Sequence, residues 1–160
     1  MRVLFLDIDG VILPFNPDNR EVPYECARRI NLLCQEFGLK VVISSSWRSE
    51  AVEQAGDWRT AHETDAWRGK YNWLHNVIGL DVEVIGVTPL LGNPHHVIPG
   101  KRGEEIIEWL EEHPEVKEWM VVDDFPVWLG PLVMHRAVIT EQQRICFDDV
   151  ALEAARKLFA

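Results

Sequence analysis

Short, mainly apolar runs alternate along the chain with longer segments in which apolar residues recur at helical spacing. A strand that is covered on both faces in a parallel sheet has an almost continuous apolar sequence, so these runs predict buried strands. We expect such strands at residues 3–6, 39–43, 82–87, 119–122 and 137–139.

The segments between the runs predict amphipathic helices, because their apolar residues return every three or four positions. Gly38 is expected to end one of these helices in a left-handed conformation, and Gly79 is expected to end another. Residues 11–22 and 49–66 are more polar, so we expect a flap-like loop in the first and a short helix with a loop in the second. The expected helices cover about 23–37, 67–78, 101–110 and 148–158.

Alternation of strands and helices at this spacing predicts an α/β fold, a Rossmann-like doubly wound parallel sheet of about five strands with helices on both faces. The 160 residues suit a single domain, 1–160. Residues 10–43 and 49–100 are largely taken up by expected elements, so we expect no separate cap domain and at most a small lid at residues 52–66.

Composition narrows the classes of function. The net charge of −10, from 16 basic and 26 acidic residues, disfavours binding to long polyanions such as nucleic acids. Three widely spaced cysteines form no Cys-x-x-Cys pair, which argues against a disulfide framework or a thiolate zinc site. No apolar segment reaches the length of a membrane span and no basic leader precedes the first strand, so we expect a cytoplasmic protein without a membrane partner.

Polar residues gather where several of the predicted strands end. Ligands of open α/β sheets bind at the carboxyl ends of the strands, so these residues are candidates for one common site. Two acids one residue apart repel each other at a partly buried strand end, so Asp7 and Asp9 require a cation or a reacting group nearby. The candidates are Asp7 and Asp9 after the first strand, Ser44, Ser45, Trp47 and Arg48 after the second, Lys101 and Arg102 at the start of the helix after the third, and Asp123 and Asp124 after the fourth.

These groups resemble the motifs of the haloacid dehalogenase-like (HAD) superfamily of phosphohydrolases. Residues 7–11 read Asp-Ile-Asp-Gly-Val and are similar to its first motif. Residues 41–44 and 121–124 are apolar strands that end in Ser and in two acids, and they are similar to its second and fourth motifs. Residues 43–48 together with 102–106 look like a smaller subgroup, the HAD domains of RNA-repair proteins. The resemblance covers almost the whole chain.

This resemblance implies covalent catalysis on a phosphoester in the presence of Mg²⁺. Asp7 would attack phosphorus as the nucleophile, and Asp9 would protonate the leaving group and later deprotonate the hydrolytic water. Mg²⁺ prefers oxygen ligands, which Asp7, the backbone carbonyl of Asp9 and Asp123 would supply. Asp124 would be a further ligand or the partner of a metal-bound water. Because the superfamily's dehalogenases lack the second acid, Asp9 implies a phosphatase.

The phosphoryl group would be held by serines and by a cation. By the family's pattern, Ser44 would donate its hydroxyl to a phosphoryl oxygen, beside Ser45 and nearby backbone N–H groups. The superfamily's usual third motif favours Lys101 as the cation, whereas the Gly after Arg102 favours Arg102 by the subgroup's pattern, and both remain candidates. A cation at a helix N-terminus opposes the macrodipole, so either residue calls for an anion.

Trp47 and Arg48 are candidates for further contacts with the substrate. Trp47 would either stack on a base or ring of the substrate or pack beneath its own loop. Arg48 would pair either with a second substrate phosphate or with an acid of the protein.

We therefore expect an Mg²⁺-dependent phosphatase whose substrate is a phosphorylated small molecule or a macromolecular terminus. An uncapped site suits a bulky substrate, unless another subunit lends a cap. One alternative is a nucleic-acid end-processing phosphatase, which would surround the cleft with exposed basic and aromatic residues, including Trp47, Arg48 and Arg102. Another alternative is a non-catalytic HAD-fold binding or regulatory domain.

Overall fold

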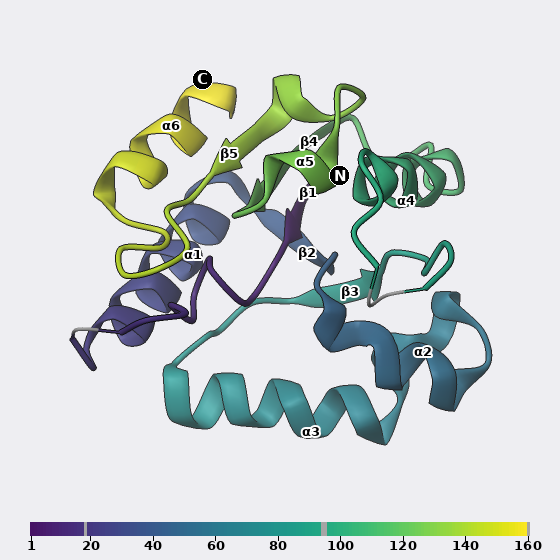
Figure 1. Ribbon diagram of the computed structural model, residues 1–160, viewed down its shortest axis with the longest axis horizontal. Coiled ribbons are helices and arrows are strands. Elements are labelled where there is room, and N and C mark those ends of the chain that lie inside the picture. The colour runs from purple at the N-terminus through teal and green to yellow at the C-terminus, as the bar shows by residue number, and fades with distance from the viewer. Residues whose placement is uncertain (18, 94–95, 160) are drawn as a thin grey trace.

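The computed structural model describes residues 1–17, 19–93 and 96–159. Within these ranges, five strands form one parallel sheet in the order β3-β2-β1-β4-β5 (Figure 1). The predicted α/β fold with a parallel sheet is confirmed. The strands are β1 (Arg2–Leu6), β2 (Leu39–Ile43), β3 (Val84–Val87), β4 (Glu118–Asp123) and β5 (Ala137–Ile139).

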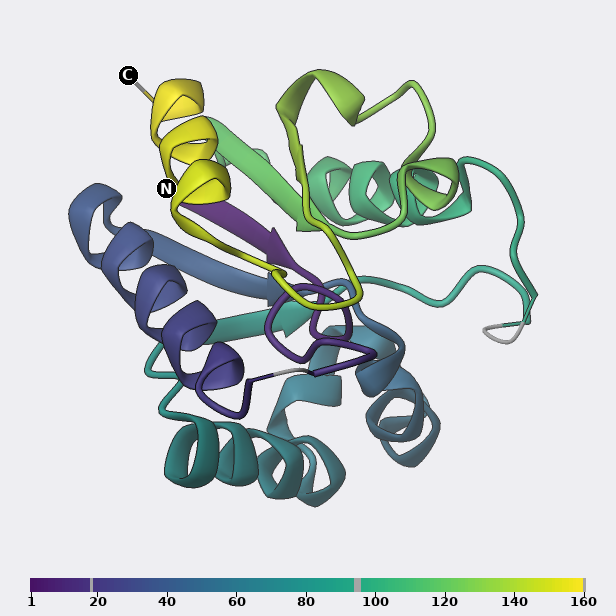
Figure 2. The same ribbon diagram turned by 60° about the vertical axis from the view of Figure 1, so that its left-hand side comes forward.

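Helices cover both faces of the sheet. α1 and α6 lie side by side over one face, and α4 and the short α5 lie over the other (Figures 1 and 2). Further short helical segments are η1 (Ser46–Arg48), η2 (Trp58–Glu63), the π-helical η3 (Leu74–Ile78) and η4 (Met134–Arg136). The α-helices are α1 (Val22–Phe37), α2 (Ser49–Ala55), α3 (Asp65–Trp73), α4 (Lys101–Glu111), α5 (Pro126–Leu129) and α6 (Asp149–Phe159).

Alternate residues of β1 divide between two apolar cores. Leu4 and Leu6 belong to the larger core, which also takes the apolar stripes of α1 and α6. Val3 and Phe5 point to the opposite core, where Trp109 of α4 meets the Phe5 ring edge to face at a centroid distance of 5.5 Å. A strand buried on both faces therefore needs the continuous apolar sequence that identified it.

The register of the central strands determines where the polar residues that follow them lie in the sheet. Leu6, the last residue of β1, is the partner of Ile43 in β2 and of Val122 in β4. The next residues are Asp7, Ser44 and Asp123, so parallel pairing brings a carboxylate, a hydroxyl and a second carboxylate to the same edge of the sheet.

The helix ends agree with the sequence, whereas the region before β3 differs from expectation. Gly38 and Gly79 adopt left-handed conformations, with φ of 64° and 86°. The expected third strand, 82–87, begins two residues later at Val84, and the segment 49–66 contains more helix than expected, since η2 follows α2. Most of the predicted loop at 11–22 is confirmed, but its last residue, Val22, is already the first residue of α1. Residue 18 lies outside the described residues.

Among the helices of the described residues, none combines the length and the apolar character that crossing a membrane requires.

Candidate active site

Three acids from two strand ends converge at the carboxyl edge of the sheet. Asp7 follows β1, Asp123 ends β4 and Asp124 follows it, and one carboxylate oxygen of each lies within 4.8 Å of the others. The backbone N–H of Asp7 donates to the carbonyl of Val122 at 3.1 Å, which extends the β1–β4 pairing into the site. Carboxylates that are so close and so buried require a compensating positive charge.

Crowding and burial perturb the titration of this cluster. Burial raises the pKa of Asp7 well above its usual range, and the negative charge of Asp123 adds to this, while Arg102 opposes it. Burial likewise raises the pKa of Asp124, to about 6. A bound divalent cation would favour the ionised forms, so the cluster is suited to hold one.

The guanidinium of Arg102 places a positive charge of the protein beside the acids. Its Nη1 donates to Asp123 Oδ2 at 2.8 Å and lies 3.4 Å from Asp7 Oδ2. The indole of Trp128 lies 4.1 Å from the guanidinium carbon and covers it as a cation–π partner. The Nζ of Lys101 instead donates to the backbone carbonyl of Asn93 at 3.1 Å. Of the two candidates, Arg102 is thus the one placed against the acids.

Gly103 allows Arg102 to reach this position. A Cβ on Gly103 would lie 2.1 Å from the carbonyl oxygen of Leu129, so only glycine lets α4 approach α5 this closely. The close contact of the two helices brings Arg102 between the acids and Trp128. The sequence shows the Arg-Gly pair as part of a motif, but its physical reason appears only in the packing.

The buried hydroxyl of Ser44 has no hydrogen-bond partner among the described residues. Its Oγ accepts and donates no hydrogen bond within the described residues, although the side chain is fully buried. Buried polar atoms are almost always paired, so this oxygen points to a ligand as its partner. Ser45 differs, because its Oγ accepts the backbone N–H of Trp47 and caps η1. The predicted role of Ser45 in phosphate binding stays a prediction.

Asp9 stands apart from the cluster and is held by a tryptophan. Its Oδ2 accepts a hydrogen bond from Trp47 Nε1 at 3.0 Å, and the side chain is only partly buried. One carboxylate oxygen is thereby fixed in place. Trp47 thus contacts a predicted catalytic residue directly, a role that neither of its sequence-based alternatives included.

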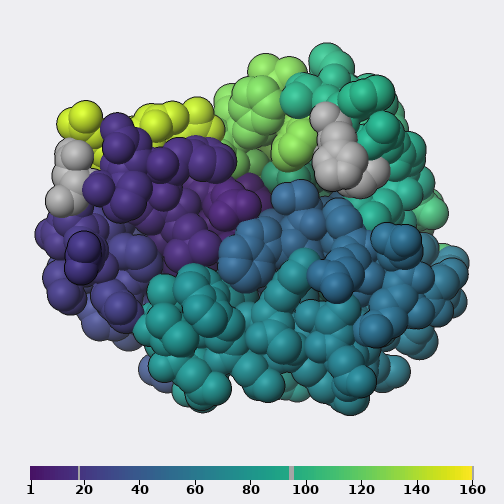
Figure 3. Space-filling view, turned by 60° about the horizontal axis from the view of Figure 1, so that its bottom comes forward, coloured from purple at the N-terminus to yellow at the C-terminus, as the bar shows by residue number. Residues whose placement is uncertain are grey.

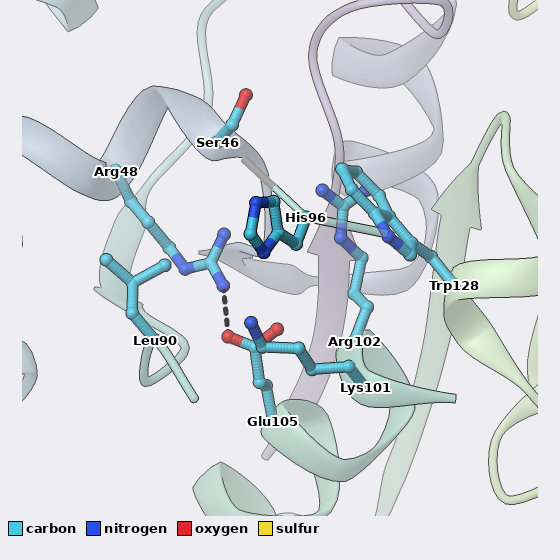
Figure 4. Close-up of a pocket in the computed structure, with 8 residues that line it drawn as sticks. All are labelled: Ser46, Arg48, Leu90, His96, Lys101, Arg102, Glu105 and Trp128. Atoms are coloured by element: carbon cyan, nitrogen blue, oxygen red, sulfur yellow. Dashed lines mark hydrogen bonds and ion pairs between the residues drawn. The ribbon is translucent and has the colours of Figure 1, made fainter. Parts of the chain in front are cut away.

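Arg48 is buried and bonded within the protein. Its Nη2 pairs with Glu105 Oε2 at 2.7 Å (Figure 4). Its other N–H groups donate to the carbonyls of Ser45, Thr88 and Pro89. Burial lowers the pKa of Arg48 to about 10, and the charge of Glu105 opposes that shift. The structure therefore shows the pairing with an acid of the protein, the second of the two alternatives for this residue.

The acids open onto a cleft at the surface. Asp9, Ser46, Arg102 and Trp128 also line this cleft, which has a volume of about 450 Å³. Figure 3 shows this region, where the N-terminal segment (purple) meets the chain that follows β2 (blue). The predicted lid, 52–66, forms the end of α2 and η2, which packs against β3. Its described residues do not line the cleft, so the lid stays a prediction.

The comparison with protein families decides the assignment. A model described as the HAD domain in Swiss Army Knife RNA repair proteins matches residues 3–151. The chain belongs to this family. No curated protein and no solved structure matches it. The match contains every residue of the HAD site described above, from Asp7 to Asp124, and it confirms the resemblance seen in the sequence.

The residues of this HAD domain fit Mg²⁺, the metal that HAD domains generally use. Asp7, Asp123 and Asp124 offer hard oxygen donors at one point, as Mg²⁺ requires. The unpaired Ser44 Oγ lies one position past β2, at the same edge of the sheet. The donor set and this unused hydroxyl together suit a metal ion with an anionic ligand beside it.

Proposed function

We propose that this HAD domain is an Mg²⁺-dependent phosphohydrolase that cleaves a phosphomonoester through an aspartyl phosphate on Asp7. The observation that carries the proposal is the division of the acids into two environments. Asp7 lies buried against Arg102 and two further acids, whereas Asp9 lies outside that cluster with one oxygen held by Trp47. Two carboxylates in unlike surroundings suit a nucleophile and an acid–base catalyst.

Asp7 is positioned to act as the nucleophile. Its carboxylate attacks phosphorus, and the bond from phosphorus to the leaving oxygen breaks as the new Asp7–phosphorus bond forms. Mg²⁺, when held by Asp7, Asp123 and Asp124, supplies positive charge to the phosphoryl oxygens. Arg102 adds a fixed cation at Nη1, 3.4 Å from Asp7 Oδ2, and Trp128 shields that cation from water.

Asp9 is positioned to move the proton. It donates a proton to the leaving oxygen in the first step and takes one from the water that hydrolyses the aspartyl phosphate in the second. The hydrogen bond from Trp47 Nε1 fixes the carboxylate for both steps. Ser44, whose buried Oγ has no partner among the described residues, would donate to a phosphoryl oxygen.

Phosphate release from a panel of substrates tests the proposal. The panel contains nucleotides, sugar phosphates, phosphopeptides, 3′- and 5′-phosphorylated oligonucleotides and an aryl phosphate, each with Mg²⁺ and with a chelator. We expect Mg²⁺-dependent release that Asp7→Asn lowers by a thousand-fold or more, at roughly the scale found for removal of a nucleophile. Release by Asp7→Asn at the wild-type rate would refute the covalent mechanism.

A nucleic-acid end-processing phosphatase is the second candidate. The description of the matching family, which names RNA repair proteins, favours it. The exposed basic residues expected for this candidate are not found at Arg48 and Arg102, since both are buried and paired. Preference for phosphorylated oligonucleotides over mononucleotides would support it. Ligand binding without turnover of any ester would instead support the non-catalytic alternative.

A further inference from the structure

A second hollow borders Asp9, and the three clustered acids are not among the residues that line it. Asp9 and Ser46 line both this hollow and the cleft that contains Asp7. The remaining wall consists of Trp47 from η1 and of Gly69, Lys70 and Trp73 from α3. The hollow has a volume of about 560 Å³, within the usual range of small-ligand sites.

Two tryptophans supply the aromatic part of the wall. The rings of Trp47 and Trp73 have centroids 6.1 Å apart and planes 39° apart, so they form one continuous aromatic surface rather than a closed stack. Trp73 is 43 % exposed, so part of its ring is accessible to a ligand. Trp47 donates its Nε1–H to Asp9, packs partly against the larger core and also lines the hollow.

The aromatic surface is held in place before any ligand binds. Lys70 Nζ donates to the backbone carbonyl of Trp47 at 2.9 Å and lies 3.5 Å from Glu50 Oε2. This contact ties α3 to η1, the two elements that carry Trp73 and Trp47. A surface that is already ordered loses little conformational entropy when a ligand stacks on it.

We propose that this hollow binds the nucleobase of the substrate, so that the preferred phosphomonoester is a nucleotide or a nucleotide at the end of a nucleic acid. The inference rests on the proposed function, because it takes Asp9 as the acid. The group attached to the leaving oxygen must lie beyond Asp9, on the side away from Asp7. Hydrolysis consumes one water and yields inorganic phosphate and the dephosphorylated nucleoside or end, with the proton from Asp9 on the released hydroxyl.

A nucleobase fits this position better than a ring attached directly to the phosphate. The ring of an aryl phosphate or phosphotyrosine begins at the leaving oxygen, within hydrogen-bond distance of Asp9, where Trp47 presents its N–H edge. A nucleobase is separated from its phosphate by a sugar, so it reaches past that edge onto the two ring faces. Base stacking on aromatic side chains is also strong for every base, because each has a π-face.

Substitution of Trp73 tests the proposal with little risk to the fold, since the side chain is partly exposed. We expect Trp73→Ala to lower kcat/KM for a nucleoside monophosphate by about 5- to 150-fold, the effect of losing one stacking contact. The loss for glycerol 2-phosphate, which has no ring, should be much smaller. Trp73→Phe should restore most of the activity on the nucleotide. Equal losses on both substrates, or no loss on either, would overturn the proposal.

Phe15→Ala is the matched control for Trp73→Ala, because Phe15 lines the cleft that contains Asp7. It is an exposed aromatic residue that lines the hollow around Asp7 but not the one at Trp73. A selective loss on the nucleotide in Phe15→Ala rather than in Trp73→Ala would place the base on that side and refute the proposal. Faster turnover of a phosphotyrosine peptide than of any nucleotide would refute it as well.

Direct binding separates this inference from the proposed function. Adenosine 5′-monophosphate is titrated into the wild-type protein and into Trp73→Ala without Mg²⁺, with calorimetry as the readout. Weaker binding by Trp73→Ala supports the base site even if no ester is hydrolysed, in which case only the proposed function fails. Hydrolysis of nucleotides with equal binding and equal kcat/KM in both proteins supports the proposed function and overturns the base site.

Discussion

Arg102 donates a hydrogen bond from Nη1 to Asp123 Oδ2 at 2.8 Å, and both side chains are almost wholly buried. The same nitrogen lies 3.4 Å from Asp7. A single guanidinium thus connects the acid that would attack phosphorus with one that would hold the metal. Lys101, the adjacent candidate, directs its ammonium to the carbonyl of Asn93 instead.

Arg102→Ala should therefore impair both catalysis and folding, and more severely than Lys101→Ala. We expect kcat/KM to fall by about 100- to 1,000-fold, the usual cost of removing a preorganised charge from a phosphoryl or oxyanion site. Loss of one partner from a buried ion pair costs about 3–5 kcal/mol, so the free energy of unfolding should also fall. Steady-state kinetics and urea unfolding measure the two effects. A larger kinetic loss in Lys101→Ala than in Arg102→Ala would assign the phosphate-binding cation to Lys101.

The fold and the acids could be predicted from the sequence because each follows from a local pattern. A strand such as β1 has to be apolar on both faces, and Asp7 ends its apolar run abruptly. Parallel topology then brings strand ends together, so Asp7, Ser44 and Asp123 could be grouped without coordinates. The strand register brings these three residues to one edge of the sheet.

The partners of the charged side chains could not be predicted, since they depend on packing between distant segments. Lys101 and Arg102 are neighbours in the sequence, yet only the approach of α4 to α5 at Gly103 decides which of them meets the acids. The pairing of Arg48 with Glu105 spans 57 residues and leaves no periodic signal. The contact of Trp73 with Trp47 likewise joins two separate elements, α3 and η1, and leaves no local signal in the sequence.

Activity should require glycine at position 10, because of its left-handed conformation and because of the space available for a side chain. A Cβ at Gly10, where φ is 79°, would lie 2.3 Å from Asp124 Oδ2, so Gly10→Ala must displace that carboxylate. We expect a large loss of phosphatase activity and a higher Mg²⁺ requirement, measured by titrating Mg²⁺ in the activity assay. Gly38→Ala is the matched control, because its φ of 64° is similar and a Cβ there meets nothing within 4 Å. Gly38→Ala should lower stability alone, and equal Mg²⁺ requirements in the two variants would contradict this account.

The buried Arg48–Glu105 pair should behave as a structural element. Glu105→Ala leaves the Arg48 guanidinium buried without its charge partner, so we expect the free energy of unfolding to fall by about 3–5 kcal/mol in urea titrations. Arg48→Met combined with Glu105→Leu removes both charges and should recover much of that loss, because apolar pairs of similar volume often replace buried ion pairs. If the double variant were less stable than Glu105→Ala, the pair would be holding its loop by the hydrogen bonds of Arg48 to the Thr88 and Pro89 carbonyls rather than by its charges.

Glu141 should make stability depend on pH through a turn that supports the cleft. Its carboxylate accepts the backbone N–H groups of Ile145, Arg144 and Gln143 at 2.8–2.9 Å, and these bonds lower the pKa of Glu141 in the folded protein. In the same turn, the carbonyl of Gln142 accepts a hydrogen bond from the backbone N–H of Phe15. The turn therefore helps to hold the segment that follows Asp9.

The sign of the effect follows from the direction of that shift. Because the folded-state pKa is below the unfolded value of about 4.3, the contribution of Glu141 to stability is complete above that value and is lost as the pH falls through the folded-state pKa. Glu141→Gln should therefore lower the free energy of unfolding at pH 7, by less than about 1 kcal/mol since the carboxylate is exposed to solvent. The difference from the wild type should shrink below about pH 4.

Urea unfolding at a series of pH values measures this difference in the free energy of unfolding. Glu53 is an exposed acid in α2, so Glu53→Gln is the control for loss of a charge. A difference that stays constant from pH 7 to pH 3 would show that the amide replaces the carboxylate in the turn and that ionisation of Glu141 contributes nothing.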